Sequence, residues 1–577
     1  MKRAVLLTSL GDVELFNREV DIVGLAGAYP IIQEYEFLNL EYFLSETTIK
    51  DVDVYDLVGK VGSGWYRDQN RDVFINQSIS IGALLNHRLI IEFASVFRYY
   101  LAFNNYIEKY DKILISRNAP KSLCIASQCF SDKIEYFDSE YQFDEHISSS
   151  VSAGTIPSPP VHKLASFLYR LAQRPFLRFL KSKTLVINDW TFDLVNNPDC
   201  LNINYLNPLR GFCLSSGLEY LAEAESIFPQ SLDGNVIYSN VKTSLSEFKI
   251  NNKLTHDIAS LFVELSQEEF AKSRDKILKI YCAYQEMFSY YSPAMVVLPG
   301  YAHPYYQMVY GIARSKNIPS MFVQDGYGVQ VEQFSFPKDM HNKKHMIDYF
   351  AVMGSYVDDL YKKVFKNNDI RTIKILSPII KTHRNVSGIN REKYAIVIFP
   401  YGKLYSPNCK RDQKYKYVLD VVDSLSDMGY DHIRVKMKRG HVPYKKEENL
   451  LMKKLLGNRA NVEMVFGEFS DYLSNACFVV GYIGTAILES FYRNVPYYVY
   501  EPISLGMSDN FIDNSVIINK ENISRTIPDL KRSIIDKNFV ALDKNKVFDG
   551  VDINEIDFNQ IIQDFKISLK DEEVFFE

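Results

Sequence analysis

The sequence predicts an α/β protein with two doubly wound units of parallel strands and a helical insertion. Short apolar runs typical of buried strands alternate with helical segments through most of the chain. A fresh series of such pairs begins after Ser387 and Gly388, and 577 residues are too many for one hydrophobic core. We therefore expect an N-terminal domain over residues 1–385, a C-terminal domain over 386–540 and a helical tail over 541–577 that crosses back to the first domain.

In the first domain, apolar runs predict strands at residues 4–9, 20–25 and 52–58, followed by a glycine-rich turn at 59–64 (GKVGSG). This turn matches neither the dinucleotide fingerprint GxGxxG nor the phosphate loop ending in GK[ST]. It is either a plain turn or an acceptor-side loop, in which Ser63 is the candidate residue. Further strands are expected at 112–116, 134–137, 184–188, 294–298, 320–323, 349–353 and 373–376, and helices at 79–109, from 120, and at 254–265, 267–290 and 305–316.

An insertion is expected at about residues 148–290. It starts with a linker-like stretch, SSSVSAGTIPSPP, and continues into a basic segment at 161–183 with no acidic residue before Asp189. Arg170, Arg174 and Arg178 share one helical face in this segment. The segment either contacts an anionic membrane surface or packs as a connector helix with its basic side in water.

In the second domain, strands are expected at residues 395–399, 433–437, 462–466, 478–480 and 495–500, and helices at 414–428, 445–456, 469–475 and from 485. The turn Gly481–Gly484 leads into the helix at Thr485, whose first backbone N–H groups have no helical partner and favour an anion such as phosphate. The alternative is a turn that needs glycine and a helix that needs a cap. The last strand delivers Glu501 to the same edge of the sheet, where open α/β sheets bind ligands.

Composition excludes several classes of function. A net charge of −5 gives no reason to expect nucleic acid. The seven cysteines are scattered without a CxxC pair, which favours reduced thiols in the cytoplasm and argues against a zinc site. No apolar run approaches the roughly 20 residues needed to span a bilayer.

Three segments between about residues 290 and 505 carry a family resemblance: MVYGIARSKNIPSMFVQDGYG, IRVKMKRGH and GYIGTAILES. In this order they resemble bacterial surface-polysaccharide glycosyltransferases of the GT-B fold, specifically the sialyl-, polysialyl- and Kdo-transferase-like groups of capsule and lipopolysaccharide biosynthesis. Those groups have His-Pro directly after the basic strand. Here the stretch from Lys438 to Pro443 departs from that pattern, so the acting side chain is left open.

The resemblance implies roles for particular residues. Asp325 is the candidate catalytic base, with His303 as the second choice, and Gln324 and Gly326 join Ser63 on the acceptor side. The candidates for holding the nucleotide are Lys436, Lys438, His441, Gly484, Thr485, Glu489 and Glu501. The alternatives are that Asp325 caps a turn, that His441 is a solvated histidine and that Glu501 is a solvated strand end.

The implied function is transfer of a sugar to a hydroxyl of a surface glycan or glycolipid, in the cytoplasm or at the inner face of the cytoplasmic membrane. The resemblance favours a CMP-activated nonulosonic acid over a UDP-sugar as donor. We expect no cofactor and no metal, because no DxD motif is present in the second domain. A CDP-glycerol-type polyol-phosphate transferase, a sugar-nucleotide epimerase and a non-catalytic glycan-assembly partner are the alternatives.

Overall fold

A computed structural model provides the structure of this chain. The residues that it describes are 3–7, 21–24, 38–39, 52, 54–68, 71–106, 108–119, 121–138, 184–188, 195, 197, 200–204, 220–300, 304–324, 347–364, 371–376, 394–400, 411–437, 449, 452–457, 459–502, 505 and 518–574.

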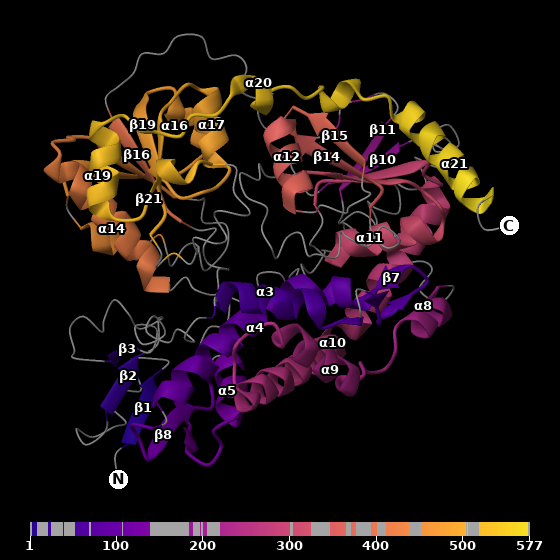
Figure 1. The fold of residues 1–577 in the computed structure, drawn as a ribbon, viewed down its shortest axis with the longest axis horizontal. Coiled ribbons are helices and arrows are strands. Elements are labelled where there is room, and N and C mark those ends of the chain that lie inside the picture. The colour runs from indigo at the N-terminus through magenta and orange to yellow at the C-terminus, as the bar shows by residue number, and fades with distance from the viewer. Residues whose placement is uncertain are drawn as a thin grey trace, which may run out of the picture.

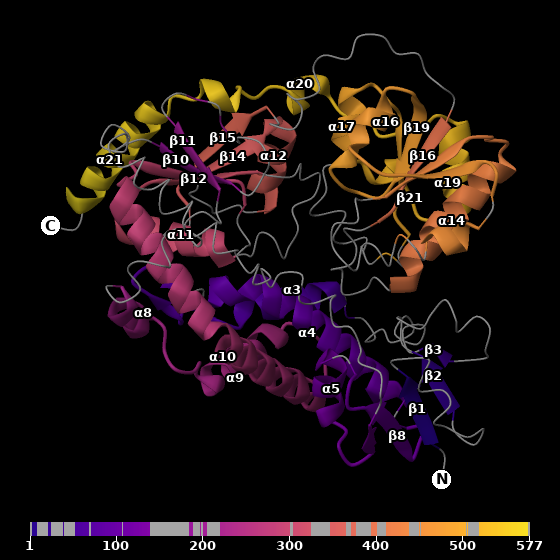
Figure 2. The same ribbon diagram turned by 180° about the vertical axis from the view of Figure 1, so that it is seen from behind.

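The described chain folds into three parallel β-sheets with helices packed around them, and two short antiparallel strand pairs lie at residues 67–72 and 75–80 (Figure 1). The predicted α/β class with parallel sheets is therefore confirmed, as is the series of helices between residues 221 and 291. Figure 2 shows from behind that the second sheet (upper left) and the third sheet (upper right) lie across the upper half of the view, and that the first sheet lies at the lower right. The exact domain boundaries at 385 and 540 stay a prediction.

The first sheet has the strand order β3-β2-β1-β8-β9. Its elements are β1 (Arg3–Leu7), β2 (Asp21–Gly24), β3 (Leu38–Asn39), β8 (Lys112–Ser116) and β9 (Ile134–Phe137). Helix α4 (Ile81–Tyr106) precedes β8 in the chain, and α5 (Lys121–Gln128) lies between β8 and β9. These strands pair only with one another among the described residues. The sequence pattern identified most of these strands but did not reveal that they form a sheet of their own.

The strand expected at residues 52–58 and the turn expected at 59–64 were wrong, because residues 54–64 form one helix, α3 (Val54–Gly64). The glycines serve close packing of this helix. A Cβ on Gly62 would lie 2.4 Å from the Ile90 side chain of α4, and one on Gly64 would lie 1.8 Å from Ser244 Oγ of α9 (Gly234–Leu245). Glycine-rich composition here indicates helix contact and not a loop.

The helical insertion lies between strands β11 (Cys200–Asn204) and β12 (Met295–Leu298) of the second sheet. It comprises α8 (Leu221–Ile227), α9 and α10 (Asn252–Tyr291). The sequence predicted two helices where the structure has the single 40-residue α10. Asn251 begins it by accepting the Leu254 N–H at 2.8 Å, and Ser292 ends it in the left-handed region at φ 44°.

The second sheet has the order β11-β10-β12-β13-β14-β15, so the direction of winding reverses between β10 and β12. Its elements are β10 (Thr184–Asn188), β11 (Cys200–Asn204), β12 (Met295–Leu298), β13 (Ser320–Val323), β14 (Tyr349–Met353) and β15 (Arg371–Ile375), with helices α11 (Pro304–Ser315) and α12 (Gly354–Val364). The neighbouring strands β12, β13 and β14 are buried throughout, as their almost entirely apolar sequences predict.

The third sheet has the order β18-β17-β16-β19-β20-β21. Its elements are β16 (Tyr394–Ile398), β17 (Ile433–Lys436), β18 (Val462–Val465), β19 (Ala476–Gly481), β20 (Tyr497–Tyr500) and β21 (Ile523–Ser524), with helices α14 (Arg411–Asp427), α16 (Phe469–Leu473), α17 (Ala486–Tyr492) and α19 (Ile527–Ile535). Winding reverses between β16 and β19. This is the doubly wound unit that the sequence predicts for the second domain.

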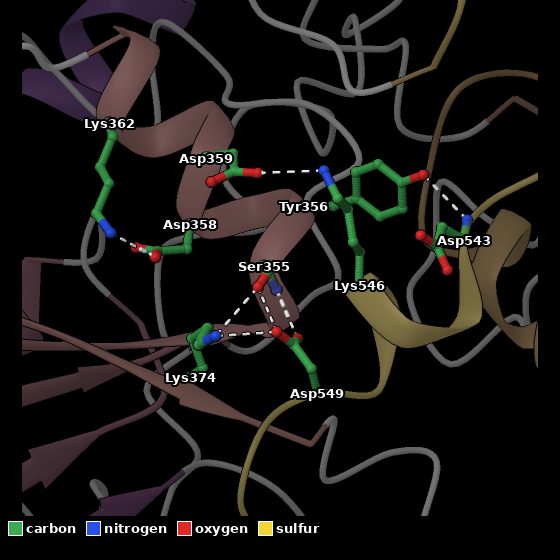
Figure 3. Close-up of polar contacts among 9 residues, drawn as sticks. All are labelled: Ser355, Tyr356, Asp358, Asp359, Lys362, Lys374, Asp543, Lys546 and Asp549. Carbon is green, nitrogen blue, oxygen red and sulfur yellow. Dashed lines mark hydrogen bonds and ion pairs between the residues drawn. The ribbon is translucent and has the colours of Figure 1, made fainter.

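The C-terminal residues run from the third sheet back to the second, through α20 (Lys544–Val547), a short 3-10 turn (Ile553–Glu555) and α21 (Phe558–Val574) (Figure 1). Val551 pairs with Ile375 at the end of β15. Figure 3 shows that Asp549 accepts hydrogen bonds from the Ser355 backbone N–H at 2.8 Å and from Lys374 Nζ at 2.9 Å. Residues 543–556 thus form a strap fastened to the edge of the second sheet.

Within the described residues, no helix combines the length and the apolar character that crossing a membrane requires.

Candidate functional site

The candidate site lies where the winding of the third sheet reverses. From β16 the chain builds outward through β17 and β18 on one side and then returns to place β19 on the other side. The connections after β16 and β19 consequently leave the sheet in opposite directions, and the crevice between them is where open α/β sheets bind ligands. Lys436, Gly484, Thr485, Glu489 and Glu501 all belong to this carboxyl edge of the sheet.

The turn after β19 is held rigidly by strand β20. The Tyr497 hydroxyl donates a hydrogen bond to the carbonyl oxygen of Tyr482 at 2.8 Å. The carboxylate of Glu501, fully buried, accepts the backbone N–H of Ile483 at 3.0 Å. Glycine is required at 481, because a Cβ there would lie 2.1 Å from the Tyr497 hydroxyl oxygen. Glu501 is thus a buried group that shapes the turn, and the alternative of a solvated strand end was wrong.

Thr485 immediately precedes α17, as expected, and its side chain makes no capping hydrogen bond to that helix. Gly484 is half-buried and close-packed, with its Cβ position 3.3 Å from the Tyr482 ring. Helix α17 has only seven residues. Its N-terminus alone is therefore a weak anion site, and neighbouring charged side chains must supply most of the attraction.

Lys436 is the last residue of β17 and is only 9% exposed. Its Nζ donates to the carbonyl oxygen of Met437 at 2.7 Å. Arg434, two residues earlier and so on the same face of the strand, lies 4.0 Å above the Tyr394 ring, and the Tyr394 hydroxyl donates to the Tyr472 carbonyl oxygen in α16. Lys436 is therefore on the sheet face that α16 and α17 cover.

Glu489 extends from α17 into the same region. Burial is the main cause that raises the pKa of this carboxyl, to about 7, and the negative charge of Glu468 adds to the rise. The positive charges of Lys436 and Arg493 lower it in part. A carboxyl with a pKa near neutrality can exchange a proton at physiological pH, which is a property of functional carboxyls more than of structural ones.

Lys414 is a residue of this edge that the sequence interpretation treated only as the start of a helix. Lys414 belongs to α14 and is fully buried, and its ammonium lies 5.8 Å from the centroid of the Phe399 ring. The Phe399 N–H in turn donates to the backbone carbonyl oxygen of Lys436 at 3.2 Å, so both lysines contact the residue that follows β16. Lysine is rarely fully buried. The sequence could have indicated Lys414 by its position, in the first turn of the helix that follows the first strand of the domain.

Tyr417, one turn further along α14, stacks on Tyr500 with a ring separation of 5.2 Å. Its hydroxyl is buried without a hydrogen-bond partner among the described residues. Burial is the main cause that raises the pKa of Tyr417, and the neighbouring Tyr497 and Glu501 raise it further. The hydroxyl stays protonated and is a donor close to Glu501.

Two acceptor-side candidates lie elsewhere. Gln324 follows β13 and is only 4% exposed. Its side-chain Oε1 accepts the Met353 backbone N–H at 3.3 Å, and its backbone N–H donates to the Ala351 carbonyl oxygen at 3.2 Å. It ties the ends of β13 and β14 together. Ser63 is in helix α3 and not in a loop, and its hydroxyl donates to the Lys60 carbonyl oxygen at 3.2 Å. The roles of both in acceptor binding stay predictions.

The remaining candidates lie outside the described residues. These are His303, Asp325, Gly326, Lys438 and His441, together with the basic segment at 161–183. In the part of the chain that is described, no three His, Cys, Asp or Glu side chains gather as a metal site would require.

Comparison with known proteins gives no sequence relative: no family model and no curated protein matches this chain. Among solved structures, it is similar to the Methanocaldococcus jannaschii UDP-GlcNAc 2-epimerase in complex with UDP-GlcNAc and UDP (11% identity, TM-score 0.37, 67% of this chain and 99% of that chain). It is also similar to S. aureus MnaA with UDP (11%, 0.34, 68% and 97%) and to a glycosyltransferase from Rickettsia africae (10%, 0.31, 67% and 94%).

Proposed function

We propose that this protein is a glycosyltransferase that binds the phosphate of a nucleotide-activated sugar at the carboxyl edge of the third sheet. The observation that carries the proposal is that a buried lysine, Lys436, and a turn fixed by hydrogen bonds at Ile483 follow strands on the two sides of β16, where the order of the strands reverses. A strand-order reversal alone marks a ligand site of unspecified chemistry. Of the charged groups at this edge, the buried lysines Lys436 and Lys414 are the ones that favour an anion as the ligand.

Each group has a part in the reaction. As the bond from the sugar to the phosphate breaks, negative charge grows on the departing phosphate, and a pre-positioned ammonium such as that of Lys436 stabilises it. Lys414, on the other side of β16, adds a second positive charge. Glu501 keeps the turn in shape, so that the backbone N–H groups around Gly484 keep a constant position.

The finer features of the proposal come from the resemblance of the three motifs. The donor is a CMP-activated nonulosonic acid, Asp325 removes the proton of the acceptor hydroxyl, and Lys438 and His441 join Lys436 at the phosphate. The acceptor is a surface glycan or glycolipid at the inner face of the cytoplasmic membrane, which the segment at 161–183 contacts.

A thermal-shift panel with CMP, CDP, UDP and GDP tests the proposal. A ligand at 100 times its dissociation constant stabilises a protein by about 2.7 kcal/mol, so binding gives a clear rise in Tm. Lys436→Gln should reduce the rise strongly. Lys416→Gln, which removes an exposed lysine of α14 paired with Asp420, is the matched control and should leave it unchanged.

Lack of a shift with all four nucleotides would refute the proposal. A larger shift with UDP than with CMP would remove the CMP donor and keep the enzyme class. Transfer is then assayed with the matching nucleotide sugar, and Asp325→Ala should abolish it with nucleotide binding nearly intact. A phosphodiester in place of a glycosidic product would show polyol-phosphate transfer instead.

A further inference from the structure

Helix α20 lies between the second and third sheets in both ribbon views (Figure 1 and Figure 2). The chain reaches it from the third sheet and continues from it along the edge of the second sheet. Residues 544–548, which comprise α20 and Phe548, form what is here named the joint. Both sheets contact this short stretch of chain.

Helix α17 of the third sheet holds the joint by its last residues. The Phe548 ring stacks on the Phe491 ring at a centroid separation of 6.1 Å and meets the Tyr492 ring edge to face at 5.6 Å. Lys544 Nζ donates to the side-chain oxygen of Asn494, just after α17, at 2.9 Å. Aromatic pairs in these geometries add directional attraction to apolar burial. The joint is therefore attached to α17.

Helix α12 of the second sheet also holds the joint (Figure 3). The backbone N–H of Asp543, just before the joint, donates to the Tyr356 hydroxyl at 3.0 Å, and Lys546 Nζ lies 5.5 Å from the centroid of the Tyr356 ring. Asp549, just after the joint, accepts the Ser355 backbone N–H at 2.8 Å. The two residues that flank the joint are thus both bonded to α12.

Two glycines show how closely the second sheet and this part of the chain approach each other. Gly354, with φ 74°, begins α12, and a Cβ there would lie 2.6 Å from the carbonyl oxygens of Lys546 and Val547. A Cβ on Gly550 would lie 2.2 Å from the backbone of Ile375 in β15. Backbone meets backbone at both points, so neither partner can shift without displacing the other.

The apolar core continues through the joint. Val547 is 2% exposed and belongs to the same cluster of buried apolar side chains as Ile487 and Leu488 of α17 and Val352 of β14. The apolar residues between α14 and the third sheet form a separate cluster, which includes Val421. Protein interiors are close-packed, so a displaced side chain displaces its neighbours. The α17 face of the third sheet is therefore packed continuously with the second sheet.

We infer that the joint couples the two sheets: a change in the position or order of α17 alters how firmly the strap holds the second sheet, and the reverse. The physical reason is the length of α20, since a helix of four residues is not stable by itself. Its two neighbours order it jointly, so the loss of one contact leaves the other to bear the whole ordering entropy. Such a coupling is reciprocal by thermodynamic necessity.

Hydrogen exchange of the full-length, ligand-free protein tests the coupling. Phe491→Leu removes the ring that stacks on Phe548 and keeps an apolar side chain. We expect exchange at the Leu376 and Val551 amides, which join the strap to β15, to become at least about fivefold faster. Amides of β13, two strands in from β15, should keep their wild-type rates.

Ser355→Ala tests the coupling in the opposite direction. It removes the hydroxyl that donates to Asp549 and accepts from Lys374, and it leaves the Ser355 backbone N–H in place. The Val540 amide donates to the Tyr497 carbonyl oxygen of β20 at 3.0 Å, on the third sheet. Exchange at Val540 should become faster by a similar factor.

Phe466→Leu is the control for both variants. It trims an exposed phenylalanine that follows the edge strand β18 and should leave exchange at all three amides unchanged. Lys544→Met is a second variant on the third-sheet side, for use if Phe491→Leu does not fold. It removes the hydrogen bond to Asn494 at an exposed position and should also speed exchange at the strap amides, by a smaller factor.

Unchanged exchange at Leu376 and Val551 in Phe491→Leu would show that the two contacts of the joint are independent, and would overturn the inference. A uniform acceleration that includes β13 would also overturn it, because it would report global destabilisation. Selective acceleration in both directions supports the inference. None of these outcomes depends on a ligand.

The coupling also extends to nucleotide binding, and this part rests on the proposed function. α17 follows directly on the turn at Ile483, so an anion bound at that turn restrains one end of the segment whose other end holds the joint. Whichever of CMP, CDP, UDP or GDP raises Tm should slow exchange at Leu376 and Val551, and Phe491→Leu should remove the slowing. Binding without slowing overturns this part alone. No binding overturns the proposed function, and the ligand-free variants still decide the coupling.

Discussion

The buried carboxylate of Glu501 accepts a hydrogen bond from the backbone N–H of Ile483 at 3.0 Å. This bond joins the end of β20 to the turn after β19, two segments that are 18 residues apart in the chain. Together with the bond from Tyr497 to the Tyr482 carbonyl oxygen, it makes the turn an extension of the sheet. The geometry of the candidate phosphate site is therefore set by β20.

We expect Glu501→Ala to destabilise the protein by about 1–3 kcal/mol, because the Ile483 N–H is left buried without its acceptor. Urea unfolding measures the loss. Glu501→Gln keeps an acceptor oxygen of the same reach and should lose less. Equal losses for the two variants would show that the charge, and not the hydrogen bond, is what matters.

Gly481→Ala should be destabilising, because the added methyl group enters the space of the Tyr497 hydroxyl. Overpacking of this kind costs roughly 1–3 kcal/mol. Tyr497→Phe removes the obstructing oxygen, so the double variant should lose less than the two single variants added together. Strict additivity in a thermal or urea denaturation cycle would argue against direct contact.

The stability of the protein should depend on pH through Glu489. Because its pKa is raised in the folded protein from 4.5 to about 7, the folded state holds the proton more tightly, and this contribution is lost as pH rises from 4.5 through 7. Glu489→Gln has no such dependence. Its Tm relative to the wild type should rise between pH 5 and pH 8, and a constant difference would contradict the raised pKa.

Asp549→Ala should loosen the strap without unfolding the protein. Partial burial acts to raise the pKa of Asp549, but hydrogen bonds from Ser355 and Lys374 outweigh it and hold the pKa below its usual range. The bonds from Ser355 and Lys374 to the Asp549 carboxylate are therefore stabilising above the pKa of Asp549, and this stabilisation is lost as the pH falls through that pKa. Hydrogen exchange at the Leu376 and Val551 amides, which join the strap to β15, should become faster in the variant.

Asp359→Ala is the matched control for the strap. It removes the long ion pair of 3.7 Å to Lys546, in which both side chains are exposed. Exposed pairs contribute about 0–1 kcal/mol, so exchange at Leu376 should stay as in the wild type. Equal acceleration in both variants would mean that Asp549 has no special part in holding the strap.

The strands of this protein were largely predictable from local sequence. The runs at 112–116, 134–137, 184–188, 320–323 and 349–353 are strands with the expected bounds. Buried parallel strands are short and rich in apolar and β-branched residues, so the local sequence is enough to identify them. The helix at 54–64 was missed for the opposite reason, since Gly62 and Gly64 reflect contacts with distant helices.

In the candidate site too, some features were predictable from local sequence and others depend on contacts between distant residues. By itself the sequence determined that a strand, a turn and a helix follow one another at 478–491, and it assigned Lys436, Glu489 and Glu501 to strand ends and a helix of one predicted domain. Only the tertiary structure decided that Glu501 is buried and accepts the Ile483 N–H, and that the charges of Lys436 and Glu468 act on the pKa of Glu489. Burial and charge proximity depend on strand order, which pairs residues far apart in the chain, whereas apolar periodicity is a local property.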